Sequence, residues 1–183
     1  MSEPNEDTDK FLNAFPVWLK SLGPDARALA AVVSSDASES GRVVLAGGLN
    51  YLLKSVDLIA DGIEDLGYLD DAFVLRVAAK AALAFDVDAA THPEAKRLAQ
   101  EAELIEAFLE SDYQRLVDYV AGLAETPVRG RSARQIVTDD AALHAFAQDV
   151  EAWAQSFEVP SFLRDEKNLV KLRAFMHTKL PAS

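Results

Sequence analysis

The sequence predicts an all-α protein, folded as a compact bundle of about seven to eight helices. Half of its 183 residues are hydrophobic, which is enough to bury a sizeable core. Alanine and leucine recur throughout, while glycine and proline number only 8 and 7, a composition that favours helices over a sheet. Successive segments repeat apolar residues at helical spacing, without an alternating, strand-like stretch of useful length.

The N-terminal region is expected to hold a tail and two helices. Residues 1–9 are polar and acidic and predict a flexible tail. A first helix is expected over about 8–22, where Pro16 predicts a kink or a late start. Gly23-Pro24 is expected to break the chain and open a second helix to about Val33. The first helix is predicted by apolar residues at helical spacing: Phe11, Phe15, Trp18, Leu19 and Leu22.

Two helices are expected in the centre of the chain, after a loop over residues 34–41. The first begins near Gly41 and contains Gly47-Gly48, where each glycine costs about 1 kcal/mol against alanine. Close approach of a neighbouring helix explains the two glycines, and a ligand at the bare backbone is the alternative. The second helix runs from Asp70-Asp71 to about Phe85, with Asp70 as a candidate N-cap.

The rest of the chain predicts further helices on either side of a linker-like break at residues 125–132. Before the break, helices are expected over about 93–109 and 113–124. After it, Ser132 and Gln135 form a capping-box pattern for a short helix. Amphipathic helices are expected over about 139–157 and 165–180. We expect residues 10–125 to form a helical domain and residues 126–183 to pack on the same body.

Charge and composition restrict the partners. Acidic residues outnumber basic ones by 30 to 18, giving a formal net charge of −12. That average field repels phosphate backbones and anionic membranes, so no nucleic-acid partner is expected. The start of the chain is unlike a signal peptide, and no apolar run reaches the roughly 18–20 residues of a membrane span. We therefore expect a cytoplasmic protein without an integral membrane segment.

A family resemblance lies in the centre of the chain. The motif consists of Asp57, Leu58, Ile59, Asp61, Ile63, Leu66, Gly67, Tyr68, Leu69, Asp70 and Asp71, preceded by Tyr51. In this order and spacing, residues of about 42–83 resemble the YkvA-like family, bacterial helical domains of unknown function. The resemblance implies two paired helices around an acidic connector, and it implies no reaction. Ser55, Ala60 and Glu64 stand where the family usually has proline, so a more continuous helix is expected in this connector.

Six carboxylates within residues 57–71 are the strongest candidate site: Asp57, Asp61, Glu64, Asp65, Asp70 and Asp71. If residues 57–66 are helical, the first four share one face and repel one another. A hard divalent cation would compensate that repulsion, because Mg²⁺ and Ca²⁺ prefer clustered oxygen ligands. The competing interpretation makes these residues helix caps and solvent-facing charges. A general acid–base role is a third alternative.

Two smaller features also have alternative interpretations. Gly67 is expected to adopt a left-handed or tight-turn conformation with Tyr68 packed beside it, or Tyr68 donates to a ligand. Arg129, Arg131 and Arg134 form the one basic cluster. They either neutralise acids of the same protein or contact an anion or a partner.

The absence of motifs decides the expected function. The chain has no cysteine, its three histidines lie in different segments, and no phosphate loop, dinucleotide fingerprint or nucleophile elbow is present. We therefore expect a non-catalytic helical interaction or scaffold protein, with a protein partner or a second copy of itself. The alternative is a divalent-cation-binding protein or an acidic-site enzyme that uses the carboxylates of residues 57–71. No other cofactor is expected.

Overall fold

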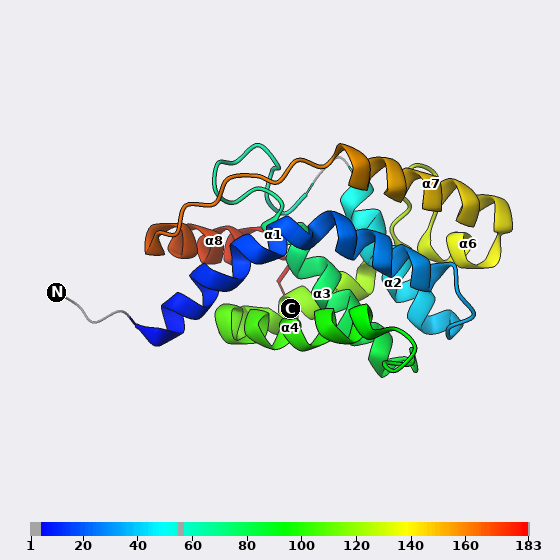
Figure 1. Cartoon of the computed structure of the whole chain (residues 1–183), viewed down its shortest axis with the longest axis horizontal. Coiled ribbons are helices and arrows are strands. Elements are labelled where there is room, and N and C mark those ends of the chain that lie inside the picture. Colours follow the sequence, from blue (N-terminus) through cyan, green and yellow to red (C-terminus); the bar gives the residue numbers. More distant parts are fainter. Residues whose placement is uncertain (1–4, 55–56, 183) are drawn as a thin grey trace.

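A computed structural model of the chain describes residues 5–54 and 57–182 (Figure 1). Over these residues the protein is all-α, as predicted, and the only β pairing is an isolated bridge between Val128 and Arg131. No helix in the described ranges is long and apolar enough to cross a membrane. The helices are α1 (Glu6–Val33), α2 (Glu39–Leu53), α3 (Leu69–Ala84), α4 (Pro93–Leu109), α5 (Tyr113–Gly122), α6 (Ala133–Thr138), α7 (Asp140–Ser156) and α8 (Glu166–Lys179), with the short 3-10 helices η1 (Glu110–Asp112) and η2 (Leu123–Glu125) on either side of α5.

Helix α1 differs from the two helices expected in its place. It begins at Glu6, inside the predicted tail, where the Asn5 side chain accepts from the amide of Asp7 at 3.3 Å. It then continues through Pro16 and Gly23-Pro24 to Val33, so the predicted break is wrong. A buried stripe runs along both halves of the helix, and this packing outweighs the cost of the two prolines. The stripe includes Phe15, Trp18, Leu19, Leu22, Ala26 and Leu29.

Helices α2 and α3 form the centre of the molecule, and α4 packs on the other side of α3. The two glycines of α2 explain how its neighbours come so close. A Cβ added to Gly48 would lie 2.8 Å from the Cβ of Ala78 in α3, and one on Gly47 would lie 3.0 Å from the backbone nitrogen of Ala124 in η2. Close helix approach is therefore the role of this pair, as the sequence predicted.

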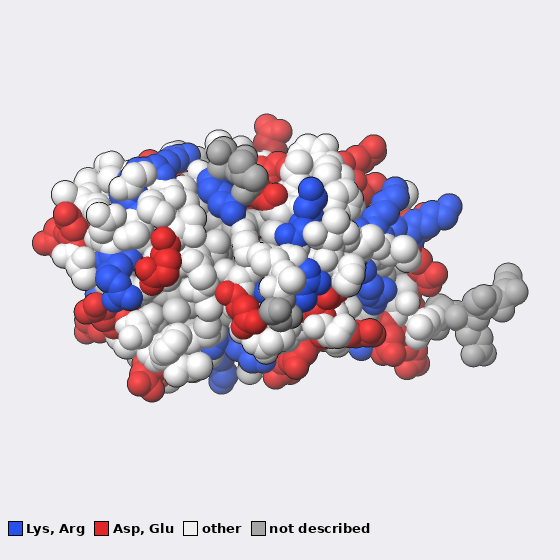
Figure 2. All heavy atoms as spheres, turned by 180° about the vertical axis from the view of Figure 1, so that it is seen from behind, with Lys and Arg blue, Asp and Glu red and all other residues white. Residues whose placement is uncertain are grey.

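The C-terminal helices cover α1 and α2. Helix α7 lies along the second half of α1 and α6 packs on α2, while an extended segment, residues 157–165, leads back along α1 to α8 (Figure 1). The Ser132–Gln135 capping box at the start of α6 is present, as predicted. Seen from behind, acidic and basic side chains are interspersed over the surface (Figure 2).

Candidate metal centre

The connector between α2 and α3 builds the candidate site. Residues 57–68 form turns rather than the helix expected there. The chain closes tightly at Gly67, where an added Cβ would lie 2.1 Å from the carbonyl oxygen of Asp61. Tyr68 then adopts the left-handed conformation, with φ of 69°, and α3 begins at Leu69. This sharp entry points the first turn of α3 back toward the connector.

Three carboxylates meet at this entry. Asp57 comes from the connector, while Asp70 and Asp71 occupy the first turn of α3. One oxygen from each residue lies within 4.8 Å of the other two. Asp70 is fully buried, Asp71 is 2% exposed and Asp57 is half-buried. We call these three residues the acidic triad.

One wall of the acidic triad is hydrogen-bonded to the end of α2. The hydroxyl of Tyr51 donates to Oδ2 of Asp70 and accepts from the amide of Leu58 at 2.7 Å. The amide of Ile59 donates to the same Asp70 oxygen at 3.2 Å. These bonds hold the connector against α2 and fix the Asp70 side chain in place.

One oxygen of each triad residue lacks a partner among the described residues. Oδ1 of Asp57, Oδ1 of Asp70 and Oδ2 of Asp71 are buried and accept no hydrogen bond from the described part of the chain. An unpaired buried acceptor of this kind costs about 1–3 kcal/mol, and more when it is charged. Each residue of the triad therefore presents an unused oxygen in a space that excludes water.

Burial and mutual repulsion both disfavour ionisation of these acids. Burial raises the pKa of Asp57 to about 7, with the charges of Asp70 and Asp61 adding to the rise. Burial raises the pKa of Asp71 well above its usual value, and the charge of Asp70 raises it further. The pKa of Asp70 is raised by burial too, although the Tyr51 hydroxyl opposes the rise. Without a counter-charge, the triad holds protons that exposed aspartates release.

The other three predicted carboxylates lie outside the triad. Asp61 is exposed as a residue, but partial burial of its carboxyl group raises the pKa of that group. The hydrogen bond from the Tyr68 hydroxyl opposes the rise. Glu64 is exposed, and Asp65 accepts from the amide of Leu163 at 2.8 Å. Asp65 thus ties the connector to the extended segment before α8 (Figure 1).

Several expected roles in this region are corrected. Asp70 is not an N-cap, because Tyr68 occupies that position and makes no side-chain cap bond. Gly67 is not left-handed, whereas Asp65 and Tyr68 are. The alternative prediction, a tight turn at Gly67, is confirmed, and the glycine permits the close approach to Asp61. The Tyr68 ring packs edge-to-face on Phe157, with centroids 5.0 Å apart. Ser55, one of the positions without the usual proline, lies outside the described residues.

The basic cluster is largely paired within the molecule. Arg131 and Arg129 both reach Asp149 on α7, at 2.5 and 3.3 Å. Hydrogen bonding to Arg131, with the nearby charge of Arg129, lowers the pKa of Asp149. Arg134 lies apart from that pair and lines a small cavity beside Glu39 and Phe85. The contacts of Arg129 and Arg131 are those of charges that neutralise an acid of the same protein.

The site therefore belongs to a helical hairpin, α2 and α3, closed by an acidic connector. Residues 42–76, from the first turns of α2 to the middle of α3, match a family model described as "Protein of unknown function (DUF1232)". The match covers this segment of the chain alone, and it confirms the resemblance predicted from the sequence, since the YkvA-like family is consistent with that description. The match includes Tyr51 and the whole acidic triad. Searches of curated proteins and of solved structures gave no match.

Sequence reasoning missed the part played by Tyr51. The motif included this tyrosine only as a matching position, whereas its hydroxyl bridges Asp70 and the Leu58 amide. The signal that could have identified it is a tyrosine within a buried helix end, since a buried phenol nearly always has a hydrogen-bond partner.

Proposed function

We propose that the protein binds a hard divalent cation at the acidic triad, Asp57, Asp70 and Asp71. The observation that supports this proposal most directly is that each of the three residues has a buried oxygen without a hydrogen-bond partner in the described part of the chain, while ligand atoms of all three residues lie within 4.8 Å of one another. Capping and solvent-facing roles do not account for these oxygens, because Asp70 and Asp71 are buried and cap no helix end.

The energetics favour a cation over three bare carboxylates. Like charges a few ångströms apart in a buried site cannot all ionise at neutral pH without compensation. A dication supplies that compensation, and each of the three residues has a buried oxygen without a hydrogen bond from the described residues. The positive end of α3 adds to the attraction for the Asp70 and Asp71 carboxylates but is far too weak to replace an ion.

The donor set points to the class of cation. The triad offers only carboxylate oxygens, and the protein has no cysteine. All-oxygen sites suit Mg²⁺, Ca²⁺ and Mn²⁺, whereas zinc sites usually include nitrogen or sulfur ligands. Water completes the coordination shell in such sites, which leaves positions that a polar ligand can take.

The test is thermal unfolding of chelator-treated protein with and without millimolar Mg²⁺, Ca²⁺ or Mn²⁺. We expect the Tm to rise with one of them, in proportion to the logarithm of its concentration above Kd. A concentration of a hundred times Kd corresponds to about 2.7 kcal/mol of added stability. Asp57→Asn and Asp71→Asn should each abolish the rise, because each removes one ligand charge.

The matched control is Glu64→Gln, which removes a carboxylate from the same connector outside the triad. This variant should keep the full cation response. If no cation changes the Tm, or if the Glu64 variant loses the response as completely as the Asp71 variant, the proposal fails. The scaffold role predicted from the sequence then becomes the leading hypothesis.

A further inference from the structure

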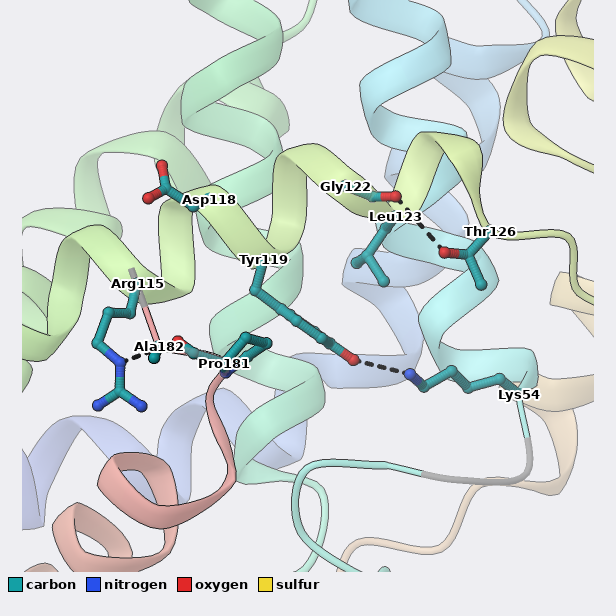
Figure 3. A pocket seen from close by; sticks show the side chains of 9 residues that line it. All are labelled: Lys54, Arg115, Asp118, Tyr119, Gly122, Leu123, Thr126, Pro181 and Ala182. Atoms are coloured by element: carbon teal, nitrogen blue, oxygen red, sulfur yellow. Dashed lines mark hydrogen bonds between the residues drawn. The ribbon is translucent and has the colours of Figure 1, made fainter.

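A second cavity lies next to the end of α2. It has a volume of about 380 Å³ and is bounded by α5, η2, Lys54 at the end of α2 and residues 181–182 (Figure 3). Its lining consists of Lys54, Arg115, Asp118, Tyr119, Gly122, Leu123, Thr126, Pro181 and Ala182. The acidic triad contributes no residue to it, so this is a separate place in the molecule.

Lys54 is the cation with free donors in the described lining, which also holds Arg115 and Asp118. Asp118 accepts from Gln114 at 2.9 Å. Lys54 is half-buried, and its ammonium group donates to the hydroxyl of Tyr119 at 2.7 Å (Figure 3).

The ammonium group of Lys54 also lies 4.7 Å from the ring centroid of Tyr51. Among the described residues Lys54 makes no ion pair, although its charge reaches Asp57 and opposes the rise in the pKa of that carboxyl. Its one hydrogen bond there goes to the Tyr119 hydroxyl, so the ammonium group has donors left for an anion.

Arg115 shapes the opposite end of the cavity. Its guanidinium is taken up by backbone carbonyls of Leu180, Pro181 (3.0 Å) and His177 (3.0 Å), and by Asp112 at 2.7 Å. It therefore holds the segment after α8 as a wall rather than offering a free charge. The surface between the two ends is mainly apolar, formed by the Tyr119 ring, Leu123 and Pro181 (Figure 3).

We infer that this cavity binds a small organic anion, with a carboxylate head on Lys54 and Tyr119 and an apolar body against Leu123 and Pro181. Ligand sites of this size combine apolar walls with a few convergent polar groups, and the Lys54–Tyr119 pair supplies both a charge-assisted and a neutral donor. No residue of the triad lines the cavity, so this inference does not rest on the cation site, although the charge of Lys54 also acts on Asp57.

The experiment uses benzoate as the probe and follows amide chemical shifts of the whole protein by NMR. We expect saturable binding with a Kd of about a millimolar or tighter, given the small number of atoms in the ligand. Benzamide, with the same ring and no charge, should bind at least about tenfold more weakly, because the charge-assisted bond is lost. Acetate, with the charge and no ring, should also bind more weakly.

Lys54→Met should weaken benzoate binding at least about tenfold. The control is Lys80→Met, since Lys80 also lies over a tyrosine ring, that of Tyr113 at 5.8 Å, but outside the cavity. It should leave benzoate affinity unchanged. Equal affinity for benzoate in the Lys54 and Lys80 variants, or equal affinity for benzoate and benzamide in the parent, overturns the inference.

A second variant keeps the test decisive if Lys54→Met does not fold. Gly122 lines the cavity, and an added Cβ there meets nothing within 4 Å, so Gly122→Leu can fill space without a clash. Leucine also has the better helix propensity. This variant should fold at least as stably as the parent and lose benzoate binding. Unchanged binding in a folded Gly122→Leu protein contradicts the inference.

Discussion

At the scale of single residues, the acidic triad determines how stability depends on pH. Burial raises the pKa of Asp57 to about 7 and raises that of Asp71 well above its usual value, so the folded state holds protons that the unfolded chain releases near pH 4. Stability falls with rising pH wherever the folded state binds more protons than the unfolded one. The triad therefore destabilises the cation-free protein progressively between about pH 4 and 7.

This linkage gives a measurable difference between variants. In chelator, the Tm of the parent should fall more between about pH 5 and 8 than that of Asp71→Asn, which has one fewer proton to lose. Saturating cation should reduce the difference, because the ion takes the place of the protons. Parallel Tm profiles for the two proteins in chelator would show that Asp71 is ionised equally in the folded and unfolded states. That result would contradict a raised pKa for a buried Asp71 carboxyl.

The sequence predicted the residues of the site better than their environment. Asp57, Asp70 and Asp71 were among the six candidate carboxylates, but nothing in the spacing distinguished them from Glu64 and Asp65. The distinction depends on burial and on the left-handed turn at Tyr68, which brings α3 back onto the connector. Both follow from tertiary packing, and an aspartate before an apolar run usually indicates a cap.

At the scale of secondary-structure elements, local signals were reliable where tertiary packing did not oppose them. The Ser132 capping box predicted the start of α6 because that motif satisfies its own backbone donors. The break predicted at Gly23-Pro24 is wrong, because the prediction considered only the local cost of these two residues to a helix. It left out the buried stripe of α1 that continues on both sides of them. Gly23 also faces α7, where an added Cβ would lie 3.6 Å from the carbonyl oxygen of Ala154.

The contact between α2 and α3 can be tested with a substitution that raises helix propensity. Alanine favours a helix over glycine by about 1 kcal/mol, yet Gly48→Ala should destabilise the protein by about 1–3 kcal/mol. The reason is that the new methyl group would lie 2.8 Å from the Cβ of Ala78 and force the two helices apart. Urea unfolding measures the difference directly.

The matched control for this contact is Gly122→Ala, at a helical position where an added Cβ meets nothing within 4 Å. That change should stabilise the protein by several tenths of a kcal/mol. If both alanine variants gain stability, the two helices do not meet as closely as described, and the predicted role of Gly47-Gly48 in close packing is wrong.

At the scale of the whole molecule, a buried arginine connects the three helices around the core. Arg76 of α3 is fully buried, donates to Glu101 of α4 at 2.8 Å, and lies 3.4 Å from Asp25 of α1. Its guanidinium also packs 4.2 Å from the ring centroid of Trp18. Burial lowers the pKa of Arg76 to about 10, while the charges of Glu101 and Asp25 oppose that change. The group thus stays charged at neutral pH.

Removing this charge should loosen the whole bundle rather than one contact. Arg76→Met leaves the buried carboxylate of Asp25 with only Arg97 and Ser21 as partners, and removing one member of a buried pair typically costs about 3–5 kcal/mol. Arg27→Met is the control, because the Arg27–Glu151 pair is exposed and contributes about 1 kcal/mol or less. Urea unfolding of both variants should therefore show a large loss for Arg76 and almost none for Arg27. Equal losses of stability for the two variants would show that Arg76 does not connect α1, α3 and α4.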